Sequence, residues 1–335
     1  MDRAFNKLNR GAAGIKTAAA LCAALLCLAA AEAGAAEGKY APKDGRILVF
    51  AGQNNNSFDE YVNTTKIIPA GFMIYTSVQA ADGLDEASDY GAGESSGRYL
   101  LDKYPGLALQ IGLYMVDALD GVVAGDYDKN LDRIGAFIAS SKRPVYLRIG
   151  YEFDGPHNHY TPSKYIKAYH YIVDRFRNSG IDNIAYVWHS YASFPPVYYQ
   201  DWYPGDAYVD WCGISFFSQH SSEFKSFMAF AKTYGKPVMI AESTPSGIGT
   251  KPGQQAWDKW FSRYFDFIDN SDISAICYIN TNWDALPMFK SFKWKDCRLG
   301  SNKLVADKWS AEMRKFRYLQ SSGDLYESIG FTETR

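Results

Sequence analysis

Short apolar runs, rich in β-branched residues and bounded by turn residues, recur along the chain from about residue 45 onward. Four to eight consecutive apolar residues of this kind are typical of a strand that is buried on both faces of a parallel sheet. We therefore expect eight strands, over residues 47–51, 72–76, 107–114, 145–152, 184–188, 212–217, 238–242 and 275–279.

Amphipathic patterns separate several of these runs and predict helices between the strands. In the clearest one, residues 161–178, apolar side chains recur at helical spacing on one face. Thr161 suits the N-cap, Pro162 the first helical position and Gly180 the C-terminal stop. A second pattern over residues 254–268 carries a stripe of aromatic residues.

Eight strands alternating with helices predict an α/β fold, a single (β/α)8 TIM barrel that forms one catalytic domain over residues 37–335. An open, doubly wound sheet is the rival architecture. Gly52 is the only glycine after the first strand, in the string FAGQNNN at 50–56, so that strand lacks the Gly-rich phosphate loop of many such sheets. In a barrel, the active site is expected at the C-terminal ends of the strands.

The first 36 residues are expected to be a cleaved signal peptide. Four basic residues precede an apolar segment at 17–31, and small residues at 33–36 offer a cleavage site. The apolar segment is short for a membrane-spanning helix. A lipid anchor on Cys27 is not favoured, because Leu25 and Leu26 precede it where a small residue is usual. We therefore expect a secreted or periplasmic protein.

The aromatic content and the net charge limit the kinds of binding partner that we expect. Aromatic residues make up 16% of the chain, which fits either sugar-stacking surfaces or an aromatic core. The formal net charge is −2 and no basic stripe occurs, so nucleic acid is not an expected partner. His157 and His159 have a spacing that could suit a metal, but no cluster of acidic or Cys residues accompanies them. We expect a sugar contact or a plain surface loop there, and no metal or cofactor.

Three cysteines follow the expected cleavage site. Cys277 and Cys297 could form a disulfide in an exported protein. Cys212 and Cys277 both lie in strand-like runs, where a small buried hydrophobic side chain is the more ordinary role.

Two of the apolar runs end in a glutamate. Glu152 ends the fourth and Glu242 the seventh, so both carboxyl groups should face each other across the mouth of a barrel. Glycosidic-bond hydrolysis requires such a pair, one group to protonate the leaving oxygen and one to attack or to activate water.

Four strings in barrel order resemble the glycoside hydrolases of clan A, and within it the β-mannanase-like barrels of family 26. Arg148 precedes Glu152 by four residues, and Trp283 follows the eighth strand. The other two strings are YPGDAYVDWCGI at 203–214, before and into strand six, and KPVMIAE at 236–242. The likeness covers residues 45–315 and is strongest from 145 onward.

This resemblance implies a retaining glycoside hydrolase in which Glu152 is the general acid/base and Glu242 the nucleophile. Retention requires carboxyl groups about 5–5.5 Å apart. The acid/base should hold a proton near neutrality, and Tyr151 and Phe153 could raise its pKa by lowering the local polarity. Glu242 should stay ionised, with Arg148 as the nearby cation.

Eight residues at or near strand ends are candidate substrate contacts, with a packing or ordinary loop role as the alternative for each. They are Arg148, Tyr151, His189, Phe217, Trp283, Gln53, Asp117 and His157.

Two positions depart from the family pattern near the reacting sugar. Tyr151 stands where His or Asn is common, and the strand-six end, SFFS at 215–218, has no tyrosine hydroxyl for the nucleophile. The expected substrate is therefore left broad: a β-linked mannan-, xylan- or glucan-like polysaccharide, or an exopolysaccharide, cleaved in endo fashion. The alternative is a glycan-binding protein on a degenerate barrel with little or no turnover.

Overall fold

The computed structural model describes residues 38–192, 196–217 and 224–332. The expected signal peptide at 1–36 therefore lies outside the described residues. Within the described ranges, no helix is both long enough and apolar enough to cross a bilayer.

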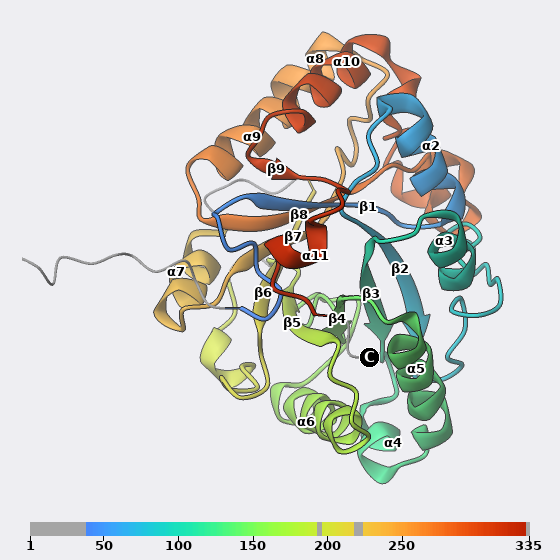
Figure 1. Ribbon diagram of the computed structural model, residues 1–335, viewed down its shortest axis with the longest axis vertical. Helices are drawn as coiled ribbons and strands as arrows, with labels where there is room; N and C mark the ends of the chain where they lie inside the picture. The colour runs from blue at the N-terminus through green and yellow to red at the C-terminus, as the bar shows by residue number, and fades with distance from the viewer. Residues whose placement is uncertain (1–37, 193–195, 218–223, 333–335) are drawn as a thin grey trace, which may run out of the picture. The chain divides into compact units, whose positions relative to one another are not determined.

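Eight parallel strands form a closed barrel (Figure 1). Closure follows from β1, which pairs with β8 on one side and with β2 on the other. The predicted (β/α)8 barrel is therefore confirmed, and the open doubly wound alternative is wrong. The strands are β1 Ile47–Gly52, β2 Gly71–Ser77, β3 Ala108–Tyr114, β4 Val145–Ile149, β5 Ile184–Ser190, β6 Trp211–Phe216, β7 Val238–Ser243 and β8 Ile273–Ile279.

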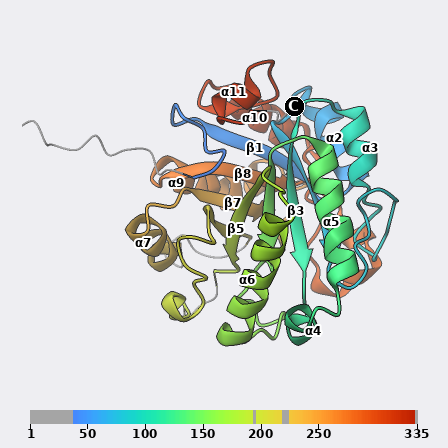
Figure 2. The same cartoon turned by 60° about the horizontal axis from the view of Figure 1, so that its bottom comes forward.

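Helices follow most of the strands, and Figure 2 shows α5 and α6 running alongside them. The predicted helix at 161–178 is α6, Pro162–Asn178, and Gly180 takes the left-handed φ of 72° just beyond its end. The predicted helix at 254–268 is α8 Gln254–Ala256, a π-helical turn Trp257–Phe261 and α9 Ser262–Asp269 in succession. The others are α2 Asn55–Thr65, α3 Gly97–Lys103, α4 Leu119–Ala124, α5 Asp128–Ser141, α7 Lys225–Thr233, α10 Lys303–Met313 and α11 Leu325–Ser328.

The core has two layers. The larger lies between the strands and the surrounding helices, and the smaller fills the barrel interior. At the N-terminal end of the strands, Tyr40 packs edge-on against Tyr146 inside the barrel and against Phe331 near the C-terminus. Both ends of the described chain therefore close the barrel floor, which leaves the opposite end for the site.

A ninth strand, β9 Tyr318–Leu319, pairs with the first residues of β1. Two residues are too few to produce a periodic pattern, so the sequence did not predict it. Cys212, Cys277 and Cys297 are all free and buried. The suggested Cys277–Cys297 disulfide is therefore absent, and the packing interpretation of Cys212 and Cys277 is confirmed.

Candidate active site

The two glutamates lie at the C-terminal end of the barrel, one in a strand and the other in a loop. Glu242 is within β7, whereas β4 ends at Ile149 and Glu152 lies three residues beyond it. The expected strand through residue 152 was therefore too long. Gly150 and Glu152 both have left-handed φ values, 54° and 55°. A Cβ atom on Gly150 would also meet the Met115 Cε atom at 2.6 Å and the Tyr165 ring at 2.9 Å, so a larger residue there would be strained.

Glu242 is paired with a buried arginine. The Arg148 Nη1 atom donates to the Glu242 Oε1 atom, and the arginine side chain is fully buried. Burial raises the pKa of Glu242, the Arg148 guanidinium opposes that shift, and the nearby Glu152 carboxyl adds to it. Because a buried guanidinium remains charged, this ion pair favours the ionised carboxylate that a nucleophile needs.

Arg148 itself packs against two aromatic rings that contact each other. Its guanidinium carbon lies 5.2 Å from the ring centroids of Tyr75 and Tyr151. The Tyr75 side chain also acts on both partners of this ion pair: it raises the pKa of Arg148 and lowers that of Glu242. Tyr75, in the second half of β2, thus lies beside the Arg148–Glu242 pair. Sequence reasoning missed it, because it lies in an ordinary strand pattern far from either glutamate.

Glu152 is surrounded by polar donors. The Ser215 hydroxyl donates to Glu152 Oε1 at 2.5 Å, and His157 Nε2 lies 2.9 Å from Glu152 Oε2. Phe153, which was expected to lower the polarity here, instead stacks on Trp188 with the ring centroids 4.5 Å apart. The groups that contact the Glu152 carboxyl are therefore a hydroxyl and an imidazole.

Ser215 was not among the predicted residues, and a strand irregularity explains its placement. The pairing register between β6 and β7 shifts after Ile214, so that Ser215 lies opposite Glu242. Such a bulge re-aims a side chain. Ser215 consequently neighbours Glu242 through the sheet and Glu152 through its hydroxyl, which brings both glutamates to one place. No periodic sequence signal marks a bulge of this kind.

A directional chain of hydrogen bonds runs from Arg148 to Glu152. The Arg148 Nη1 atom lies 3.2 Å from His189 Nδ1, and His189 Nε2 lies 3.0 Å from Ser215 Oγ. Burial and Arg148 lower the pKa of His189 well below its usual range, so its ring is neutral. Since arginine only donates, Nδ1 must accept and Nε2 must carry the proton. His189 therefore donates to Ser215, which donates to Glu152.

Two of the predicted aromatic contacts, Phe217 and Trp283, belong to one aromatic cluster. Phe217 packs on Trp294, with the ring centroids 5.3 Å apart, and Trp283 packs on Trp294 and Phe289. Trp283 is only 2% exposed, and its Nε1 atom donates to Thr244. Trp294 is the more exposed ring of the two, and the role of Trp283 as a substrate contact stays a prediction.

Two predicted contacts are less directly connected to the glutamates. Gln53 is buried immediately after β1, at the same end of the barrel. Asp117 is exposed in the loop after β3, at a φ of 60°. Their roles as substrate contacts stay predictions.

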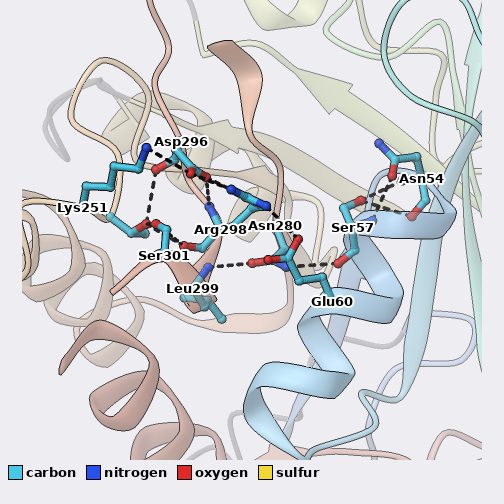
Figure 3. Close-up of polar contacts among 10 residues, drawn as sticks. Asn54, Ser57, Glu60, Lys251, Asn280, Asp296, Arg298, Leu299 and Ser301 are labelled. Atoms are coloured by element: carbon cyan, nitrogen blue, oxygen red, sulfur yellow. Dashed lines mark hydrogen bonds and ion pairs between the residues drawn. The ribbon is translucent and has the colours of Figure 1, made fainter. Parts of the chain in front are cut away.

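A polar network fastens the loop after β8 to its neighbours (Figure 3). Arg298 pairs with Asp296 at 2.8 Å and with Glu60 on α2 at 3.4 Å. Lys251, from the loop after β7, reaches Asp296 at 3.6 Å. Asn280, which follows β8, donates to the Ser57 carbonyl and accepts from the Leu299 amide. These bonds hold the Trp283 segment against α2 and the β7 loop.

The sequence is similar to those of two known hydrolases over almost its whole length. A β-1,3-xylanase from Alcaligenes sp. is 32% identical over 346 aligned positions, which cover 94% of this chain and 73% of the relative. A β-1,3-xylanase from Vibrio sp. is also 32% identical and is covered to 75%. The model of glycosyl hydrolase family 26 matches residues 136–279. The chain belongs to glycosyl hydrolase family 26.

Solved structures of the family share the fold. A family 26 β-mannanase from Bacteroides ovatus superposes with a TM-score of 0.65 at 16% identity, over 88% of this chain and 96% of that one. The catalytic domain of an endo-β-1,4-mannanase from Bacillus sp. JAMB-750 gives 0.62 at 17% identity, over 85% and 90%. The family resemblance predicted from the sequence is thus confirmed, and the protein is a glycoside hydrolase.

The site geometry fits the two tasks of this hydrolase family. One carboxyl group is held against a buried guanidinium and a tyrosine hydroxyl, and the other against a serine hydroxyl and an imidazole. Of the predicted residues, the structure brings Glu152, Glu242, Arg148, Tyr151, His189 and His157 together. A chemically differentiated pair of carboxyl groups is the requirement for acid/base and nucleophile roles.

Proposed function

We propose that this family 26 hydrolase is an endo-acting β-1,3-xylanase. The observation that carries the proposal is the 32% identity to two β-1,3-xylanases, which extends over 94% of the chain. The mannanase structures are half as similar in sequence and bear on the fold alone. The departures at Tyr151 and at the strand-six end agree with a sugar other than mannose at the reacting position.

In the proposed mechanism, Glu242 attacks the anomeric carbon and forms a glycosyl ester. Glu152 protonates the leaving oxygen and then removes a proton from the water that hydrolyses the ester. Arg148 and Tyr75 hold the Glu242 carboxylate charged and oriented, and Ser215 orients the Glu152 carboxyl. Two displacements at the same carbon give net retention.

The substrate is tested with a panel of polysaccharides. Reducing-sugar release should be faster on β-1,3-xylan than on β-1,4-xylan or β-1,4-mannan by about tenfold or more, because the backbone linkage decides which chain shape fits the mouth. Early products should be oligosaccharides of several lengths, as expected of endo cleavage. Preferential release from β-1,4-mannan would contradict the proposed substrate.

We also propose that the enzyme is exported, because a polysaccharide is too large to enter the cytoplasm and must be cleaved outside it. The basic, apolar and small-residue segments of the first 36 residues support it. N-terminal sequencing of the protein recovered from the periplasm or the medium should place the cleavage near Ala36. A full-length chain that still begins at Met1 in those fractions would contradict cleavage.

A further inference from the structure

The loop after β4 places an imidazole directly on the carboxyl group that must handle the proton. His157 Nε2 lies 2.9 Å from Glu152 Oε2, while the Glu152 side chain is 7% and the His157 side chain 49% exposed. The half-exposed His157 therefore contacts the buried Glu152 carboxyl from the solvent side of the barrel mouth.

Local structure shows that this contact is built into the loop. Gly155 has no Cβ atom, and one placed there would meet the His157 ring at 2.6 Å. The Asn158 side chain donates to the carbonyls of Tyr151 and Glu152 at 2.9 and 2.8 Å. Gly155 leaves room for the ring, and Asn158 fixes the turn that carries the glutamate. The two residues together set the imidazole on Glu152.

Hydrogen-bond directions assign the proton of the acid to one oxygen. Glu152 Oε1 accepts from Ser215, whose own partner His189 is a neutral donor. Oε1 is thus held as an acceptor, and an acidic proton belongs on Oε2, the oxygen that faces His157. A proton between Oε2 and Nε2 can reside on either atom.

We propose that His157 is a positioning residue that stores the proton of the acid/base Glu152. In the resting site the proton lies on His157 Nε2 and Glu152 is a carboxylate. When the glycosidic bond breaks, its electron pair goes to the leaving oxygen, which takes a proton from Glu152 Oε2. His157 supplies that proton and becomes neutral, while a Glu242 oxygen bonds to the anomeric carbon.

The second half returns the proton. Water attacks the anomeric carbon, the bond to Glu242 breaks with its electron pair, and the water proton passes through Glu152 to His157. This step rests on the proposed retaining mechanism, but it concerns a pair of residues that can be observed without substrate.

The charges around His157 favour storage of a proton. Hydrogen bonding to Glu152 raises the pKa of His157, and the carboxylates of Glu242 on β7 and Asp154 on the same loop act in the same direction. Asp154 is fixed at the β5 end by Ser190 and the Tyr191 amide. The ring of Tyr191, the residue after β5, also meets the imidazole edge-on, with centroids 5.5 Å apart. Negative groups thus surround the ring, and burial opposes them only in part.

The first test follows the titration of the His157 imidazole by NMR, in the wild type and in Glu152→Gln. We expect a pKa above the ordinary histidine value in the wild type, and a return toward about 6.5 in the variant, because the amide carries no charge. An ordinary value in the wild type, or one unchanged by the substitution, would overturn the proposal.

The second test measures the pH profile of kcat/KM for His157→Gln, with His159→Gln as the matched control. Glutamine keeps a donor near Glu152 but cannot store a proton. The alkaline limb should therefore move to lower pH by about one unit, because the proton held on the imidazole is no longer available. His159 is exposed on the same loop, and its variant should keep the wild-type profile.

A His157→Gln variant that keeps the wild-type alkaline limb would overturn proton storage, even if its rate were lower at every pH. The profile is measured on whichever polysaccharide the enzyme cleaves. Failure on β-1,3-xylan would therefore count against the proposed substrate and not against this inference.

Discussion

The two carboxyl groups of the site occupy contrasting environments. Glu242 lies within strand β7 and is held by a fully buried arginine. Glu152 follows a left-handed turn and meets a serine hydroxyl and a half-exposed histidine. The first environment fixes one charge state, whereas the second offers a proton a path to and from the carboxyl. The strand end thus supplies a rigidly held nucleophile, and the loop supplies an acid/base that can exchange its proton.

Replacement of Glu242, the rigidly held carboxyl group, should produce the largest loss of activity. Glu242→Gln should lower kcat by about 10⁴-fold or more, because an amide cannot form the glycosyl ester. The measurement is the initial rate on the best polysaccharide, with near-UV circular dichroism to establish the fold. Glu86→Gln, an exposed glutamate, is the control and should be fully active. A Glu242→Gln enzyme near the wild-type rate would remove this residue from the mechanism.

Replacement of Glu152 should give a loss that depends on the leaving group. Glu152→Ala should be slower on the polymer by roughly 10²- to 10⁴-fold, since a sugar alkoxide needs a proton to leave. Glycosylation by an aryl glycoside with a good leaving group should lose far less, and azide should restore its turnover. Equal losses on both substrates without azide rescue would indicate that Glu152 is only structural.

Replacement of Arg148 should affect stability and the acid limb of the pH profile. Arg148→Met leaves Glu242 buried without its counter-ion, at a cost of about 3 kcal/mol in the free energy of unfolding. With the opposing guanidinium gone, burial raises the Glu242 pKa further, so the acid limb of kcat/KM should move to higher pH. Denaturant unfolding and a pH–rate profile measure the two effects.

The control for Arg148→Met is Arg98→Met, which removes an exposed ion pair with Asp85. Arg98→Met should lower the free energy of unfolding by at most about 1 kcal/mol and leave the pH profile of kcat/KM unchanged. Equal stability losses in the two variants would mean that the pair at Glu242 is not the buried anchor described above.

Much of the fold was predictable from the sequence, because buried parallel strands are continuous apolar runs that stand out at the expected spacing. The eight runs and the helix at Pro162–Asn178 were found in this way. The predicted strand at 145–152 is too long, because the left-handed turn at Gly150 does not interrupt the apolar pattern of the sequence. The ninth strand was missed because it is two residues long.

The site was predictable where a charged residue interrupts an apolar strand, as Arg148 and Glu242 do. Tyr75 and Ser215 were not, because each depends on where a neighbouring strand places it. A tyrosine and a serine are ordinary strand residues until the register of the sheet is known, and the bulge after Ile214 decides what Ser215 touches. Contacts of this kind arise from three-dimensional closure of the barrel.

The stereochemistry of the first product tests the division of roles most directly. Proton NMR of a β-linked substrate at early times, before mutarotation, should show the β-anomer at the new reducing end, because Glu242 attacks first and water second. Initial release of the α-anomer would mean a single displacement by water. That result would contradict Glu242 as the nucleophile and with it the assignment of one rigid and one proton-carrying glutamate.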